Sequence, residues 1–260
     1  MNTHTIVILL LYILVIYSIG MVYAIQTVYG HYFSKDDRAS FLALVHQINV
    51  ETKLINTNFP SNVSLAIEHT ENTAKLLNHV YQFGEDIADD NDFIREYNEQ
   101  INNTNSTVQA LILANVVDEI LRNYGKALEV DYDLTNMSNM VMSNNSHSTT
   151  MMKMMGGSMK NSSIIREKSD NNMTNNMIVN LADYQTAQAL SYKALQIFDK
   201  DLKPMAVTSN VTNFISNLEN GLRQLRDAIN ENAAPTDVMM IVHTQIHPNL
   251  QKAYNLQLIS

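Results

Sequence analysis

Histidine and methionine side chains at helical spacing near the C-terminus are the first candidates for chemistry in this chain. In the segment VMMIVHTQIHPNL, Met239, His243 and His247 follow one another at intervals of four, and Met240 is adjacent. Side chains four residues apart share one face of a helix. Two imidazoles and a thioether suit copper, whereas two histidines without a cysteine or a carboxylate are a poor zinc set. The competing interpretation is a polar cap on a helix that Pro248 breaks.

A second group of soft donors lies between residues 137 and 159, where methionine is dense. Thioether sulfur stays neutral at every pH and, together with imidazole, suits Cu(I) outside the cell. The alternative is a low-complexity tract of biased composition, because M-x-M and MM-x-MM are permissive patterns. Copper is therefore the expected cofactor, held by the C-terminal group or by this one. The expected ligands in this segment are His147, Met151, Met152, Met154 and Met155.

The sequence contains few residues or motifs that other kinds of functional site would need. The chain contains no cysteine, which excludes disulfides, thiolate metal sites and cysteine nucleophiles. It also lacks a Gly-rich phosphate loop, a nucleotide-binding glycine fingerprint, a Gly-x-Ser-x-Gly elbow and a His-Glu-x-x-His motif. With 26 acidic against 17 basic residues, a nucleic-acid partner is disfavoured. Asp118 and Glu119 are interpreted as a solvated pair on a helix surface. These absences favour a protein that is not an enzyme, and the alternative is an enzyme with a metal centre in a helical bundle.

The N-terminal segment predicts a membrane location. Residues 6–25 carry no charge over twenty positions, enough for a helix to cross a hydrocarbon core of about 30 Å. The first interpretation is a retained anchor in contact with membrane lipid. The alternative is a signal peptide cleaved after small residues such as Val22-Tyr23-Ala24, which would release a secreted protein.

Two opposed observations bear on the orientation of the body. Lys35 and Arg38 follow the apolar segment and no Lys or Arg precedes it, which by the positive-inside rule would place the body in the cytoplasm. Against this, Asn-x-Ser/Thr acceptor patterns are used only outside the cytoplasm. Their number favours an extracytoplasmic, glycosylated body, although an Asn-rich chain acquires some by composition alone. The patterns begin at Asn62, Asn102, Asn105, Asn136, Asn144, Asn161, Asn172 and Asn210.

Apolar residues recur with a helical period over most of the remaining chain, and only seven glycines and four prolines interrupt it. This pattern predicts an all-α protein: an N-terminal membrane helix followed by a bundle of about five to seven helices. The expected helices cover 36–57, 61–84, 92–101, 106–129, 180–204, 210–231 and a last one from Pro235 that breaks at Pro248. The expected organisation is a signal anchor over 1–33, helical parts over 34–130 and 179–260, and between them a long disordered Met/Asn/Ser-rich linker over 131–178.

Two segments carry a family resemblance. LANVVDEILRNYGKAL (113–128) and VMMIVHTQIHPNLQKAYNLQL (238–258) resemble membrane-anchored, extracytoplasmic helical proteins of ammonia-oxidising archaea. Such organisms run a copper-dependent membrane ammonia monooxygenase with small helical partner subunits, so the resemblance implies a copper-rich surface environment. It transfers no catalytic residue. The resulting hypothesis is a non-enzymatic copper-handling bundle, and the alternative is a structural or accessory subunit of a membrane complex or of the cell surface.

Overall fold

The structure, a computed structural model, describes residues 36–87, 105–136, 177–206 and 211–256, without the side chains of 83–87. Every regular element in these ranges is helical. Counting η2 and η3 with α6, and α8, η5 and α9 as one broken helix, the described residues form six helices, as the all-α prediction requires. The apolar segment 6–25, the predicted helix 92–101 and the Met-rich segment 137–159 lie outside the described residues. Among the helices that are described, none has the length and apolarity to cross a membrane.

Side-chain caps mark where the helices begin. Asp36, Asn62, Asn105 and Asn180 each place a side-chain oxygen on a backbone N–H of the first turn, at 2.9–3.2 Å. Such caps satisfy amide groups that the helix itself leaves open. The helices that follow these caps are α2 (Asp37–Asn58), α3 (Val63–Ile87), α5 (Ser106–Ala127) and α6 (Leu181–Ile197).

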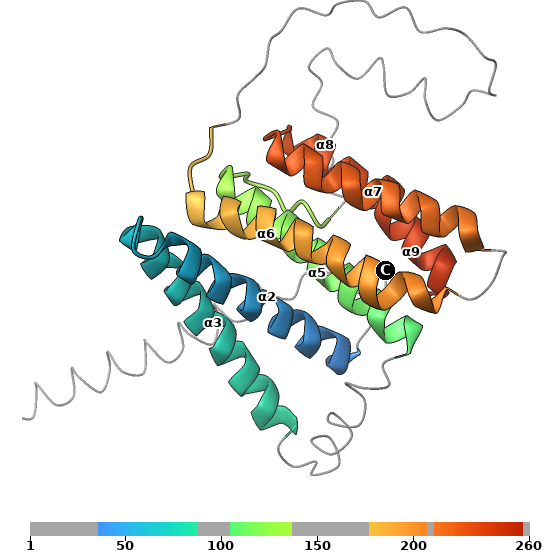
Figure 1. The fold of residues 1–260 in the computed structure, drawn as a ribbon, viewed down its shortest axis with the longest axis horizontal. Coiled ribbons are helices and arrows are strands. Elements are labelled where there is room, and N and C mark those ends of the chain that lie inside the picture. The colour runs from blue at the N-terminus through green and yellow to red at the C-terminus, as the bar shows by residue number, and fades with distance from the viewer. Residues whose placement is uncertain (1–35, 88–104, 137–176, 207–210, 257–260) are drawn as a thin grey trace, which may run out of the picture.

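The core surrounds α5, whose side chains are buried on nearly every side. This helix packs against α2 and α6, and also against α8 (Pro235–Ile241) and α9 (His247–Tyr254). On the far side of α6 lies α7 (Thr212–Asn230) (Figure 1). In contrast, α3 packs chiefly on α2, and its second half diverges from the other helices (Figure 1).

Two π-turns precede prolines and share a sequence pattern. IFDKDLKP runs from 197 to 204 and IVHTQIHP from 241 to 248. In the first, η2 (Phe198–Leu202), the N–H of Lys203 donates to Phe198 five residues back. In the second, η5 (Val242–Ile246), the N–H of His247 donates to Val242 in the same way. A proline ring clashes with the carbonyl four residues earlier, and a wider turn relieves that clash. The expected break at Pro248 therefore takes the form of a π-turn.

A glycine allows α7 to approach this broken helix. A Cβ at Gly221 would lie 3.1 Å from the Ile246 side chain and 3.2 Å from Gln245 Cβ. These distances are shorter than ordinary carbon contacts, so a side chain at position 221 would push the two helices apart.

Candidate functional site

The predicted histidine pair does come together. The rings of His243 and His247 are 5.2 Å apart between centroids and nearly perpendicular, at 81°. From α5, Asp118 brings Oδ1 to 3.3 Å from His247 Nε2. The side chains of His247 and Asp118 are both almost completely buried. Two imidazoles and one carboxylate thus meet where the last helix packs on α5.

The position of Asp118 corrects the sequence interpretation. The prediction of a solvated Asp118–Glu119 pair is wrong for Asp118, which is 2% exposed. Because α5 is surrounded by other helices, a carboxylate on it has a polar environment only where a neighbour supplies one, and His247 does so. Glu119 is partly buried and pairs with Arg122 one turn later.

The proton positions on His243 follow from its hydrogen bond. Its Nε2 lies 3.0 Å from the backbone carbonyl of Leu134. A carbonyl only accepts, so Nε2 carries the proton and donates it. Burial, together with the neighbouring His247, lowers the pKa of His243, so its ring is neutral at pH 7. In this neutral form Nδ1 carries the lone pair that a metal would need.

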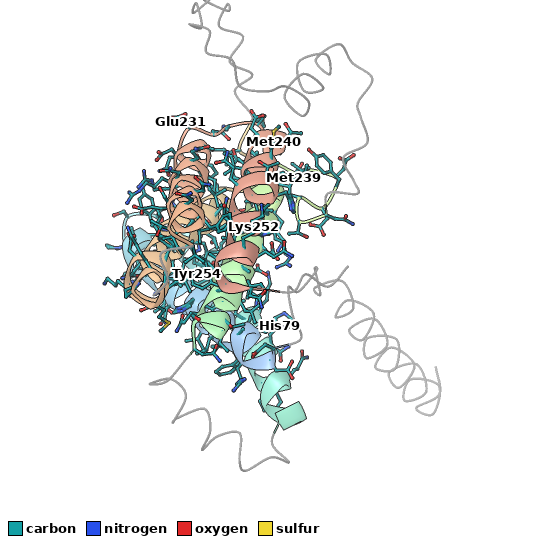
Figure 2. All side chains as sticks on the ribbon, turned by 90° about the vertical axis from the view of Figure 1, so that its right-hand side faces the viewer. His79, Glu231, Met239, Met240, Lys252 and Tyr254 are labelled. Atoms are coloured by element: carbon teal, nitrogen blue, oxygen red, sulfur yellow. The ribbon has the colours of Figure 1, made fainter. Side chains whose placement is uncertain are left out.

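The methionines behave differently from one another. Met239 is fully buried and belongs to the hydrophobic core, whereas Met240 is partly exposed at the same end of α8 (Figure 2). Met239 therefore contributes packing at this position. His147 and Met151, Met152, Met154 and Met155 fall outside the described residues. In the part of the chain that the structure describes, no cluster of three or more His, Asp or Glu side chains is arranged to hold a metal ion.

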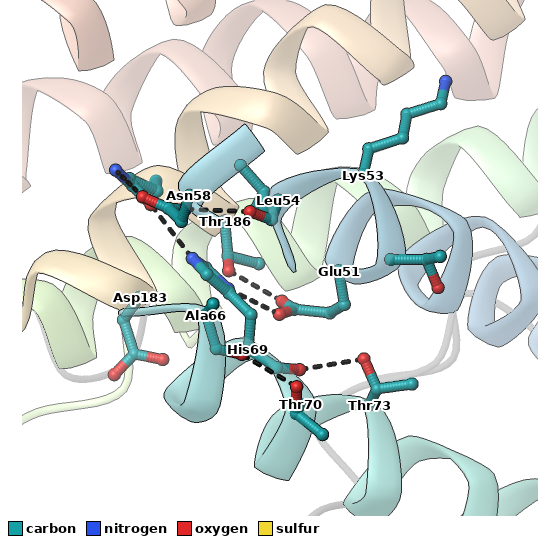
Figure 3. A network of polar contacts seen from close by, with 12 residues as sticks. Glu51, Lys53, Leu54, Asn58, Ala66, His69, Thr70, Thr73, Asp183 and Thr186 are labelled. Carbon is teal, nitrogen blue, oxygen red and sulfur yellow. Dashed lines mark hydrogen bonds and ion pairs between the residues drawn. The ribbon is translucent and has the colours of Figure 1, made fainter. Parts of the chain in front are cut away.

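A second buried polar group joins α2, α3 and α6, and sequence reasoning missed it (Figure 3). His69 is fully buried, with Nδ1 2.7 Å from Glu51 Oε2 and Nε2 3.0 Å from Gln185 Oε1. The hydroxyl of Thr186 donates to Glu51 Oε1 at 2.7 Å. The one sequence feature that points to it is the spacing of His69, which follows the buried Leu65 and Ala66 by four and three residues.

The electrostatics of this group favour a charged histidine. Burial alone would lower the pKa of His69, but its hydrogen bonds to Glu51 and Gln185 and the nearby charges of Glu51 and Glu68 raise it overall. Asp183, on α6, has a pKa raised by burial and by the same acidic neighbours. His69 is thus the cationic partner in an acidic cluster.

On the face of α3 next to the one that packs on α2, apolar side chains point to solvent. Val63, Ile67 and Leu77 are each about half exposed, at 49%, 54% and 51%. With the exposed Thr70 and Ala74 they follow the spacing four, three, four, three. Residues at this alternating spacing lie along one face of a helix, and the same spacing defines the contact face of a coiled coil. We call Val63, Ile67, Thr70, Ala74 and Leu77 the outer stripe.

Comparison with known proteins identifies no relative. No protein-family model matches the chain, and neither the curated proteins nor the solved structures contain a significant match.

Proposed function

We propose that the protein is a membrane-anchored, extracytoplasmic helical bundle that acts without catalysis as an accessory subunit, docking onto a helix of another subunit. The outer stripe of α3 is the observation that carries this proposal. Scattered exposed apolar residues are ordinary, but an aligned set on a helix that projects from the bundle marks an interaction surface.

The spacing and the charges define the partner. A repeat averaging 3.5 residues matches a second helix with its own apolar seam. Exposed Glu71 lies beside the stripe, and exposed Glu68 and Lys75 lie further round the helix. If two copies of this chain paired their α3 helices antiparallel, with the middle of each outer stripe in contact, Glu71 of one copy would lie opposite Glu71 of the other. A partner helix carrying Lys or Arg beside its seam avoids that repulsion, so we assign the stripe to a different subunit.

The location is supported by the N-terminal segment and by the acceptor patterns. Asn62 and Asn105 are exposed and begin two of these patterns. Both cap helices through Oδ1. A glycan is carried on the amide nitrogen, so capping and glycosylation are compatible at these positions.

The docking proposal predicts a site-specific cross-link. We replace Leu77 with a photoreactive residue and irradiate the native cells. We expect a cross-link to one partner protein, and mass spectrometry should identify the cross-linked peptide as part of an amphipathic helix with Lys or Arg beside its apolar seam. Reversing the flank with Glu71→Lys should lower the yield several-fold. A photoreactive residue in place of Gln196, exposed on α6, is the matched control.

Three outcomes would overturn the docking proposal. The first is an equal yield at position 196. The second is a cross-link between two copies of this chain, accompanied by a dimer mass in solution. The third is a cross-link within one chain, which would show that another segment of the same protein covers the stripe.

A copper-handling role is the second candidate, favoured by the meeting of His243, His247 and Asp118. Cu(I) accepts few ligands, and the lone pair on His243 Nδ1 is one available donor there. The Met-rich segment would supply neutral sulfur donors, of which Met151, Met152, Met154 and Met155 are the densest. Together these groups would deliver a soft ion to the membrane surface, where the anchor holds the bundle.

The copper role predicts competition for Cu(I). We expect the full-length protein to withhold Cu(I) from a weak chelator with micromolar or tighter affinity. Changing the four methionines to leucine should remove most of this capacity, and His243→Ala with His247→Ala a smaller part. His79→Ala, at a partly buried histidine on α3, is the control. A wild-type protein that does not compete for Cu(I) would remove this candidate.

A further inference from the structure

The attachment of α3 depends on few side chains. From Val63 to Gln82, only Leu65, Ala66 and His69 are buried, all within the first two turns. Beyond His69 the helix packs on α2 through partly exposed residues and contacts α6 only slightly. Among the side chains described up to Gln82, a hydrogen-bonded histidine is therefore the last fully buried group that holds α3 to the bundle.

The hydrogen bonds fix the orientation of every amide in this group (Figure 3). Asn58 Nδ2 lies 2.9 Å from the backbone carbonyl of Leu54, which only accepts, so this atom is the amino group. The same nitrogen donates to Gln185 at 2.8 Å, so the Gln185 atom is the carbonyl oxygen. That oxygen also accepts from His69, so His69 Nε2 carries a proton.

The other ring nitrogen carries a proton as well. His69 Nδ1 and Glu51 Oε2 are 2.7 Å apart, so one proton lies between them. Imidazole is a stronger base than a carboxylate, which places this proton on His69. Thr186 donates to the second oxygen of Glu51 and stabilises the carboxylate. The hydrogen-bond arrangement therefore requires an imidazolium paired with a carboxylate.

The charges that act on His69 are those of Glu51 on α2 and of Glu68, which precedes it on α3. On α6, Asp183 lies near the same two carboxylates and near the cations Lys126 of α5 and Lys75 of α3. Lys53 of α2 is exposed and points away from the group (Figure 3). On α3, Lys75 is exposed to solvent. Loss of the proton would leave a neutral ring among these carboxylates.

We propose that His69 and Glu51 form a pH-sensitive clamp, which holds α3 on α2 and α6 while His69 is protonated and loosens when that proton is lost. The inference rests on the proposed function, because α3 carries the outer stripe by which the subunit docks. When α3 is released, the angle between α3 and the bundle and the rigidity of α3 both change, and so does the position of the outer stripe relative to the partner helix.

The sign of the pH dependence follows from the raised pKa of His69. A group whose pKa is higher in the folded state contributes its full stabilisation below its ordinary pKa of 6.5. That contribution is lost as pH rises through the folded value. The clamp is therefore closed below pH 6.5 and weakens progressively as pH rises from there to the folded pKa.

Amide hydrogen exchange of the full-length protein across a pH series tests the clamp. After correction for the intrinsic rate, protection of α3 relative to α5 should fall by up to about tenfold per pH unit as pH rises from the ordinary histidine pKa of 6.5 to the folded pKa, and should then level off. In His69→Gln the protection should be lower and independent of pH. His79→Gln, at a histidine of α3 outside the clamp, should keep the wild-type profile.

Nitrogen chemical shifts provide a second measurement that needs no variant. At pH 6 both ring nitrogens of His69 should be protonated in the wild-type protein, and Glu51→Gln should move the loss of the second proton to lower pH. One unprotonated nitrogen at pH 6, or wild-type α3 protection that does not change with pH, would overturn the clamp. Neither measurement involves a partner, so a failed clamp with an intact Leu77 cross-link leaves docking standing, and the reverse result leaves the clamp standing.

Discussion

Replacing Glu51 with alanine is expected to lower the free energy of unfolding by about 3–5 kcal/mol. The substitution leaves the imidazolium of His69, which is fully buried, without its counter-ion and removes the acceptor of Thr186. An uncompensated charge in a low-dielectric interior is among the costliest defects in a protein. Urea unfolding followed by circular dichroism at pH 6, where the clamp is closed, measures the change.

The matched control is Glu219→Ala. Glu219 also pairs with two cations, Lys203 at 2.7 Å and Arg223 at 2.8 Å, but these lie at the surface. Exposed pairs contribute little, so we expect a loss of no more than about 1 kcal/mol. Glu51→Leu combined with His69→Leu should recover most of the loss, because a hydrophobic pair needs no counter-ion. Equal losses for Glu51→Ala and Glu219→Ala would contradict a buried ion pair.

Replacing Phe198 with alanine is expected to cost about 3–5 kcal/mol of stability. Phe198 opens the π-turn η2 and is fully buried in the core. Its removal leaves a cavity, which neighbouring helices fill only in part. The same denaturation experiment applies, and Phe59→Ala is the control, since that ring is 63% exposed and its loss should change stability by less than about 0.5 kcal/mol. Similar effects at the two positions would show that Phe198 is not packed as described.

The positions of the helices could be predicted from the sequence to within a few residues. The expected 36–57 and 106–129 correspond to Asp37–Asn58 and Ser106–Ala127. Local rules account for this agreement, because an apolar stripe at helical spacing and an Asp or Asn cap act within a few turns. The expected 180–204 is right in extent, but Pro204 makes its last turns a π-turn and a 3₁₀ turn.

The polar sites could be predicted only in part. The spacing of His243 and His247 correctly predicts that their rings are neighbours, because both belong to one helix. The same reasoning failed for Asp118, since a helical period shows which face a residue occupies but not whether a partner on another helix meets it. Met239 shares the helical spacing of the histidines and yet packs in the core, because α7 and α5 enclose that side of α8.

Sequence alone determined that this chain forms amphipathic helices, where most of them begin, and that two histidines share a face. Only the tertiary structure decided that His69 meets Glu51, 18 residues away, and that Glu51 meets Thr186, 135 residues away. Helix formation is governed by neighbours along the chain, so it can be read from periodicity and caps. The pairing of buried charges depends on how distant helices pack, and that packing is settled by the whole core at once.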